Sequence, residues 1–404
     1  MVTVLRTVDD VLAWAELLVG PPLRTAVGRL PEPSREVAEL QLGGLDEDPP
    51  AARTRAALTL VCAGAVGGDP HDAVAGAVAV ELVHHWSGLQ RDLFDGDLTR
   101  LHRPTAWSVV GPHPATLGGQ AMLALAFDVA ATGDPTRRVP RPLRQASRAT
   151  PDTAPSVPAV PSVPSREPVR QDRATRDRFT EQHGTPDPCA DARRQSGAAS
   201  VDRAGVRILG DTVQQLLHGQ HTDLSTALDP VLPRHRSGND LLRTCISAVE
   251  QRSGALFGCA CALGALAGGG DPARVEQLRL FGVRLGLAVR FAEDLQGIWG
   301  DPAVTGRPAF ADLRGRRRSL PVAAALAAGA DELADLLHRE TRLSEADLER
   351  AAKVVERSGA RSWCAQQADD LLAQALVALD LAIPEPAAVA ELVALARWAT
   401  RHPA

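Results

Sequence analysis

Two groups of acidic side chains in this chain have a spacing that suits a divalent cation. Asp92 and Asp95 are three residues apart, so a helix would place both carboxylates on one face. Glu293 and Asp294 precede a strongly cationic stretch at residues 316–318. Mg²⁺ links carboxylate and phosphate oxygens, while guanidinium groups offset the remaining charge. The combination predicts a site for a diphosphate.

Either acidic group alone is more typical of a solvated helix face, so their order and flanking residues matter. The flanks read EL-x-H-x-x-S and D-G-D-x-x-R with RPT-x-W around the first group, and D-x-x-G-IWGDP-x-x-TG-x-P, DLR and SLP around the second. With these motifs the chain resembles the polyprenyl synthetase family, the trans-isoprenyl diphosphate synthases, over residues 50–400 apart from an insert. The resemblance implies an all-α enzyme in which carboxylates bind Mg²⁺ that grips an allylic diphosphate.

The family's functional residues can be carried over position by position. The first carboxylate motif falls on Arg91, Asp92 and Asp95, and the second on Glu293, Asp294 and Gly297. The resemblance therefore implies Mg²⁺ ligands at Asp92, Asp95, Glu293 and Asp294, with Asp92, Asp95 and Asp294 as the catalytic carboxylates.

The cations expected to hold the allylic diphosphate all keep their charge. They are Arg100, Arg252, Arg307 and Arg317. Two further arginines depart from the family pattern, because Arg91 stands where the leading aspartate is expected and Arg290 where a glutamine is expected. An arginine beside the metals would repel them or bind phosphate in place of one.

The half-site for isopentenyl diphosphate is depleted. Ala52 and Leu101 stand where the family has cations, and only Arg55 and His84 remain as substrate-binding residues there. Two lost charge-assisted contacts of about 1.5–3 kcal/mol each would weaken this half-site about 10²-fold or more. The sequence therefore favours an enzyme that ionises an allylic prenyl diphosphate and directs the carbocation to cyclisation or transfer.

Two alternatives remain open. The chain is an elongating prenyl diphosphate synthase if Arg55, His84 and the neighbouring Arg53 compensate for the lost contacts. It is a noncatalytic partner of an active homologue if Arg91 prevents metal binding. The chain length of the substrate stays open, because the residues before the first motif set the depth of the substrate cavity. The bulky Trp86 suggests a shallow cavity, whereas the small Gly88 suggests a deep one.

Hydrophobic periodicity predicts helices at residues 8–18, 53–65, 73–98 and 117–131, and again from 201 to the C-terminus, with no strand of useful length. We expect one large all-α bundle of the isoprenoid synthase type, whose halves are residues 1–133 and 201–404. Residues 134–200 are rich in Pro, Arg and Ser and lack periodicity, which predicts a disordered insert.

Composition and charge argue against some partners and cellular locations. A net charge of −5 and a pI near 6.1 give no basic field of the kind that nucleic-acid binding requires. The six cysteines form no CxxC pair and read as reduced core thiols, and charged residues interrupt the apolar N-terminus. We expect a cytoplasmic protein with no integral membrane segment. The resemblance implies a homodimer built through residues 117–127, or pairing with a homologue.

Overall fold

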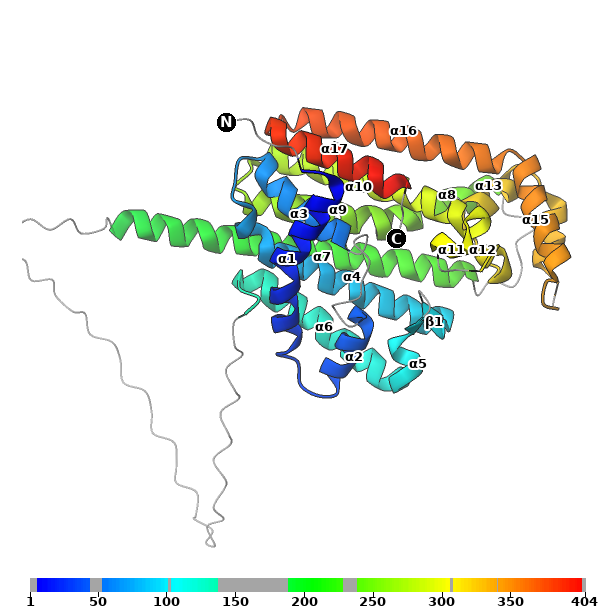
Figure 1. Cartoon of the computed structure of the whole chain (residues 1–404), viewed down its shortest axis with the longest axis horizontal. Coiled ribbons are helices and arrows are strands. Elements are labelled where there is room, and N and C mark those ends of the chain that lie inside the picture. The colour runs from blue at the N-terminus through cyan, green and yellow to red at the C-terminus, as the bar shows by residue number, and fades with distance from the viewer. Residues whose placement is uncertain are drawn as a thin grey trace, which may run out of the picture. The chain divides into compact units, whose positions relative to one another are not determined.

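The computed structural model describes residues 6–43, 53–100, 103–136, 188–227, 238–305, 308–339 and 341–401. Within these ranges the regular structure is helical, apart from two short strands that pair antiparallel, β1 (Thr99–Arg100) and β2 (Arg103–Pro104). The prediction of an all-α fold is confirmed (Figure 1).

The helices of the N-terminal half precede residue 137, and those of the C-terminal half follow residue 187. In chain order they are α1 (Val8–Val27), α2 (Ser34–Leu42), α3 (Thr54–Ala65), the 3₁₀ turn η2 (Pro70–Ala73), α4 (Val74–Asp95), α5 (Ala106–Val110), α6 (Pro112–Thr132), α7 (Pro188–Ala227), α8 (Gly238–Val249), the π-helical turn η3 (Glu250–Gly254), α9 (Ala255–Ala267), α10 (Pro272–Trp299), α11 (Pro302–Thr305), α12 (Ala311–Arg314), α13 (Leu320–Ala327), α14 (Asp331–Leu337), α15 (Glu345–Arg357), α16 (Ala360–Leu381) and α17 (Pro386–Arg401).

The chain divides into two units, and the first, residues 1–137 and 198–404, is compact. In the first unit, α10 packs against α9 and α16, α3 packs against α9, and α4 packs against α6 (Figure 1). Helices from both halves share one hydrophobic core. Of the insert expected at 134–200, residues 137–187 lie outside the described residues, and α7 begins within the expected range at Pro188.

Glycines let three helices of the core approach backbone to backbone. A Cβ at Gly264 of α9 would lie 2.8 Å from the carbonyl carbon of Thr59 in α3, and a Cβ at Gly282 of α10 would lie 2.7 Å from that of Phe257 in α9. Neither position has room for a larger residue without displacing a helix. The glycines therefore fix the distance between α3, α9 and α10, the last of which carries the second acidic motif.

Local signals set the ends of the helices that carry the motifs. The Asp271 carboxylate accepts hydrogen bonds from the Ala273 and Arg274 N–H groups, and Pro272 follows it, so α10 begins with a side-chain cap. Helix α4 ends at Asp95 because Gly96 takes a left-handed conformation with φ of 68°. The first motif thus occupies the final turn of its helix.

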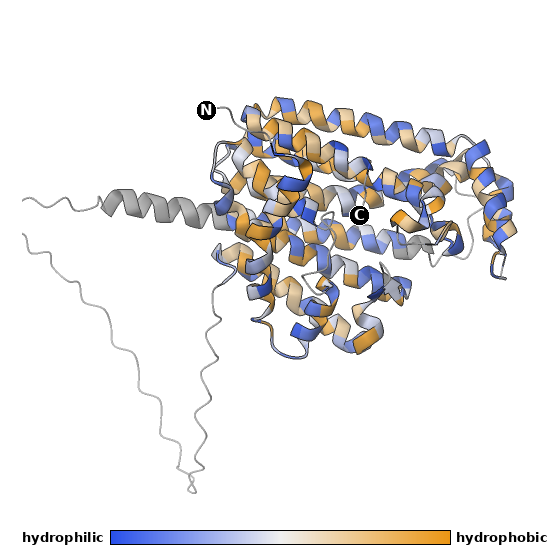
Figure 2. Ribbon diagram, viewed as in Figure 1, coloured by the Kyte–Doolittle hydropathy of each residue, from blue (hydrophilic) through white to orange (hydrophobic). Residues whose placement is uncertain are grey.

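Helix α6 is apolar on most sides but is only partly covered. Gly118 and Met122 are buried, whereas Leu117 remains 63% exposed. Among the described helices α6 alone is long and apolar enough to cross a membrane, yet it packs along α4 and α2 as a helix of the bundle. In Figure 2 the apolar colouring of α6 contrasts with the largely hydrophilic α15 at the far end of the molecule.

Candidate functional site

The first motif occupies the C-terminal end of α4. Asp92 is buried, with 1% exposure, while the Asp95 side chain one turn later is 41% exposed. Arg91 lies beside them and is partly buried. The predicted placement of the two carboxylates on one turn of a helix is therefore correct, and Asp95 is the more accessible of the two.

The second motif lies near the C-terminal end of α10, where Asp294 is 2% exposed. Arg290, one turn earlier, places its Nη2 atom 2.7 Å from Oδ1 of Asp294 and its Nη1 atom 3.4 Å from Oε2 of Glu293. The backbone N–H of Leu320, at the start of α13, donates to the other Asp294 oxygen at 2.8 Å. The Asp294 carboxylate thus has a donor on each oxygen.

Arg317 links the two motif regions. It lies in the loop between α12 and α13, and its Nη2 atom is 2.8 Å from Oδ2 of Asp97 and 3.6 Å from Oδ2 of Asp95. Burial opposes its charge, but Asp97, Asp95 and Asp312 outweigh that effect and raise the pKa of Arg317. The loop after the second motif is therefore joined to the end of the first.

Arg252 lies in the π-helical turn η3, an irregularity often found at functional sites. Its Nη1 atom is 2.5 Å from Oδ2 of Asp223 in α7. Burial, aided by Asp95 and Asp294, raises the pKa of Asp223 despite the opposing charge of Arg252. The ion pair therefore joins η3 to α7.

Sequence reasoning missed two acidic residues of this region, Asp223 and Asp312. Asp312 of α12 is 4% exposed and fills the space beside Gly297, where an added Cβ would lie 2.6 Å from its Cγ atom. Gly297 occupies a position of the second motif without a carboxylate, so its small size was the available signal. Asp223 lies in the run GQ-x-x-DL at residues 219–224, which belongs to the motifs of the family resemblance, but no role was assigned to its carboxylate.

The residues of the depleted half-site lie at the start of α3 and within α4. Arg53 is buried between Glu16 and Glu81, which are its ion-pair partners. The other Glu81 oxygen accepts a hydrogen bond from the Ala56 N–H at 3.1 Å and so caps α3. Arg53 is therefore a structural side chain that joins α1, α3 and α4.

Arg55 is buried in α3, with its guanidinium carbon 5.8 Å from the ring centroid of Phe257. Its Nε atom is buried and has no hydrogen-bond partner among the described residues. Burial lowers the pKa of Arg55, although Glu81 and Glu293 oppose that shift. A buried donor of this kind is available to an anionic ligand.

The adjacent histidines of α4 differ in their surroundings. His85 lies 4.0 Å from Glu81, and burial together with the charges of Arg53 and Arg55 lowers its pKa to about 3. It is therefore neutral at physiological pH and packed within the fold. The His84 ring meets that of His85 edge to face at 5.3 Å, and His84 is only partly buried.

Several predicted site positions cannot be placed. Arg307, Leu101 and Ala52 lie outside the described residues, and for Arg100 only the backbone, in β1, is described. Their assigned roles remain predictions.

The carboxylates fit a divalent ion unequally. No group of three or more His, Cys, Asp or Glu side chains within the described ranges is arranged to hold a metal by itself. Asp92 and Asp95 share one helix turn, and the exposure of Asp95 suits an ion that also takes ligand and water oxygens. Asp294 fits less well, because Arg290 and the Leu320 N–H already satisfy its two oxygens.

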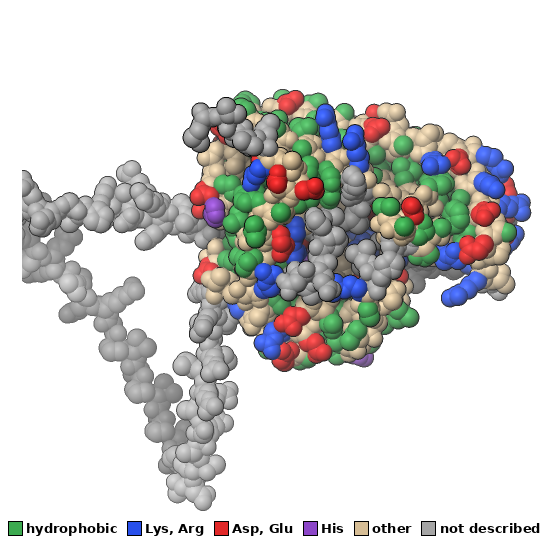
Figure 3. All heavy atoms as spheres, viewed as in Figure 1, with side chains coloured by type: hydrophobic (Ala, Val, Ile, Leu, Met, Phe, Trp, Pro, Cys, Tyr) green, Lys and Arg blue, Asp and Glu red, His purple; other side chains and the backbone are tan. Residues whose placement is uncertain are grey.

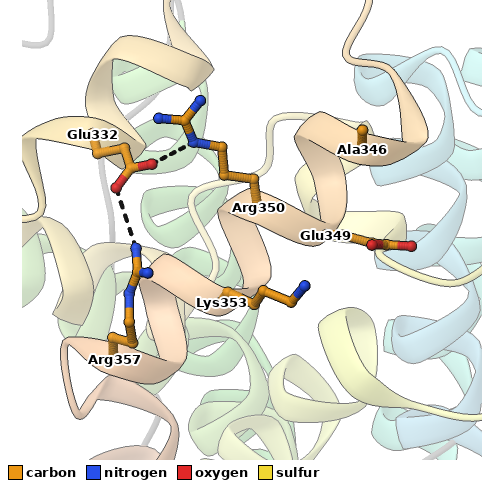
Figure 4. Close-up of a pocket in the computed structure, with 6 residues that line it drawn as sticks. All are labelled: Glu332, Ala346, Glu349, Arg350, Lys353 and Arg357. Carbon is orange, nitrogen blue, oxygen red and sulfur yellow. Dashed lines mark hydrogen bonds and ion pairs between the residues drawn. The ribbon is translucent and has the colours of Figure 1, made fainter.

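Away from the motifs, a surface hollow is lined by Glu332, Ala346, Glu349, Arg350, Lys353 and Arg357 (Figure 4). Arg350 and Arg357 both pair with Glu332. On the face drawn in Figure 3, basic side chains gather at the end formed by α15. The hollow contains none of the predicted site residues.

Comparison with known proteins relates the chain to enzymes of isoprenoid biosynthesis. The family model described as polyprenyl synthetase matches residues 196–356. The chain is 31% identical to the (2E,6E)-farnesyl diphosphate synthase of Mycobacterium tuberculosis, covering 97% of this chain and 93% of that one. It is 32% identical to a geranylgeranyl diphosphate synthase of the same species, covering 95% of this chain and 91% of that one. The crystal structure of a polyprenyl synthetase from Streptomyces coelicolor A3(2) matches with a TM-score of 0.75 and 30% identity, covering 97% of this chain and 99% of that one.

Proposed function

The chain belongs to the polyprenyl synthetase family, the trans-isoprenyl diphosphate synthases, and from that premise we propose that it binds and ionises an allylic prenyl diphosphate with the help of Mg²⁺. The carbocation then cyclises or is transferred to an acceptor other than isopentenyl diphosphate. The observation that carries the proposal is the contact of Arg317, which follows the second motif, with Asp95 and Asp97 at the end of the first motif.

The charges of the site suit a diphosphate. Arg252, Arg290 and Arg317 each pair with carboxylates, and each remains partly accessible. Ser319 adds a buried hydroxyl without a hydrogen-bond partner among the described residues, directly before the Leu320 N–H that binds Asp294. Buried donors without partners are costly, which supports a ligand whose oxygens complete them.

Ionisation of an allylic diphosphate leaves negative charge on the departing group. Arginines held in place before the reaction stabilise that charge without reorganising, and buried surroundings strengthen their effect. Mg²⁺ bound at Asp92 and Asp95 would add further charge stabilisation. The apolar stretches of α4 and α10 that precede the motifs would keep water from the carbocation.

The state of Arg53 supports a reaction that does not use isopentenyl diphosphate. Its ion pairs with Glu16 and Glu81 commit it to the junction of α1, α3 and α4. It is therefore not available to replace the cations missing at residues 52 and 101. Arg55 and His84 alone would leave a second diphosphate weakly held.

Elongation of a prenyl chain is the second candidate. It is favoured by the similarity to farnesyl and geranylgeranyl diphosphate synthases, which extends over 97% and 95% of the chain. In that case the unpartnered Nε of Arg55 would contribute to binding isopentenyl diphosphate.

Product analysis separates these functions. The purified full-length protein would be incubated with Mg²⁺ and geranyl, farnesyl or geranylgeranyl diphosphate, each with and without isopentenyl diphosphate, and the products identified by mass spectrometry. We expect hydrocarbons, alcohols or transferred prenyl groups without isopentenyl diphosphate. Longer diphosphates formed only when it is added would establish elongation, and no product under any condition would favour a noncatalytic partner subunit.

A further inference from the structure

Arg290 is bound to the carboxylates that the second motif would offer to a metal ion. Its guanidinium lies 2.7 Å from Asp294 and 3.4 Å from Glu293, and all three residues lie on α10 within about one helix turn. The remaining Asp294 oxygen accepts the Leu320 N–H at 2.8 Å. A divalent ion that bound Asp294 would share the carboxylate with both donors and would lie beside the positive charge of Arg290.

The guanidinium is held in its charged form. A guanidinium keeps its charge when it is buried, and the Asp294 and Glu293 carboxylates lie 2.7 Å and 3.4 Å from it. The second motif therefore has a fixed positive charge of its own before any metal ion binds. Resemblance to the family places an uncharged glutamine at this position, which would leave the carboxylates for metal ions.

Arg290 is also able to bind an anion. Its side chain is 22% exposed, and its Nε atom has no hydrogen-bond partner among the described residues. A guanidinium binds phosphate through two parallel N–H donors, which gives orientation as well as attraction.

We propose that Arg290 takes the place of one divalent ion in this site, so that the chain binds a diphosphate through a resident guanidinium at the second motif and needs metal only at the first. The inference rests on the proposed function, because it concerns the same diphosphate. It predicts diphosphate binding that persists without metal and a smaller number of metal ions in the complex than the motif carboxylates would suggest.

Calorimetric titration with inorganic diphosphate tests this on the full-length protein, once in EDTA and once in excess Mg²⁺. The variants are Arg290→Gln and Arg290→Lys, with Arg284→Gln as the matched control, because Arg284 is a partly buried arginine of the same helix that donates to the Gln374 carbonyl of α16. We expect the unaltered chain to bind in EDTA within about 10-fold of its affinity in Mg²⁺. Arg290→Gln should bind diphosphate about 10- to 10²-fold more weakly in EDTA than the unaltered chain. Arg290→Lys should show a smaller loss of this affinity, and the control Arg284→Gln should show none.

Metal counting gives a second readout that does not depend on the absolute affinity. Bound Mn²⁺, measured by electron paramagnetic resonance at saturating inorganic diphosphate, should be one ion fewer per chain in the unaltered protein than in Arg290→Gln. Equal Mn²⁺ counts, or metal-free affinity unchanged by Arg290→Gln, would overturn the inference. Binding of diphosphate only with Mg²⁺ would also overturn it while leaving the proposed function intact, whereas no binding under either condition would overturn both.

Discussion

At the scale of single residues, several carboxylates of the site are paired with arginines, some from another element and some from the same helix. Arg317 pairs with Asp95 and Asp97 across two elements, and Arg290 pairs with Asp294 along one helix. The chain contains one lysine, Lys353, so the cations around the motifs are all arginines. Guanidinium groups stay charged when buried and suit planar, paired contacts with carboxylate and phosphate.

Asp294→Asn tests the second motif. The amide keeps the size of the side chain and an acceptor for the Leu320 N–H, but it loses the charge that pairs with Arg290. A charge-assisted contact of about 3 kcal/mol corresponds to a loss of turnover of about 10²-fold. Steady-state kinetics on allylic diphosphates would measure this, with the exposed Asp335→Asn of α14 as the control. Full activity of Asp294→Asn would refute the assignment.

His85 makes stability depend on pH in a defined direction. Its folded-state pKa of about 3 lies below the ordinary value of 6.5, so as pH falls the unfolded chain takes up the proton first. The contribution to stability is complete above about pH 6.5 and is lost as pH falls toward 3, by up to about 1.4 kcal/mol per pH unit. Urea unfolding of His85→Gln should therefore show a weaker pH dependence than the unaltered chain between pH 6.5 and 4. The same dependence of unfolding free energy on pH in both proteins would contradict this assignment. His113→Gln, at an exposed position, serves as the control.

The sequence predicted some of these contacts and not others, for physical reasons. Asp92 and Asp95 were predictable because helical spacing alone places them on one face. The pairing of Asp223 with Arg252 was not, because it depends on how α7 packs against η3. The ion pair that keeps Arg53 from binding substrate was not predictable either. Its partner Glu81 comes from another helix, so the buried pair depends on the tertiary arrangement of α3 and α4.

At the scale of helices, breaks and glycines decide where the motifs lie. Periodicity predicted α4 to continue to residue 98, but Gly96 ends it at Asp95. The first helix was expected to stop at residue 18, before Pro21 and Pro22, and that end was wrong because α1 continues through both prolines to Val27. Its buried face continues with Leu23 and Ala26, so tertiary packing outweighs the local cost of the prolines.

Gly297→Ala tests how α10 accommodates α12. The new methyl would lie 2.6 Å from Cγ of Asp312 and push that carboxylate away from Arg290 and Arg317. Overpacking of this kind should destabilise the fold by about 1–3 kcal/mol and lower turnover. Gly64→Ala of α3 is the control, since its nearest neighbour is 3.8 Å away and alanine favours the helix by about 0.5–1 kcal/mol. Equal denaturation midpoints for the two variants would contradict this account.

At the scale of the whole molecule, the homodimer predicted from the family resemblance would use the exposed side of α6. Leu117, Gln120 and Ala124 are exposed at helical spacing on one side, while Phe127 lies near Gly210 of α7. The family resemblance predicts a homodimer through residues 117–127. The structure narrows the expected contact to the N-terminal two-thirds of that stretch.

Leu117→Glu tests the dimer. A charge placed at the centre of an apolar contact should weaken association by about 10²-fold or more, because it would be buried without a partner. Light scattering coupled to size-exclusion chromatography would measure the mass of the unaltered chain and the variant, with Leu17→Glu, at an exposed position of α1, as the control. A monodisperse monomer for the unaltered chain would contradict the prediction.

The most direct test of the central claim is the release of inorganic diphosphate from an allylic prenyl diphosphate in the absence of isopentenyl diphosphate. The account predicts Mg²⁺-dependent release for at least one of geranyl, farnesyl and geranylgeranyl diphosphate, reduced about 10²-fold by Asp92→Asn. Release that requires isopentenyl diphosphate, or that is unchanged in Asp92→Asn, would contradict it.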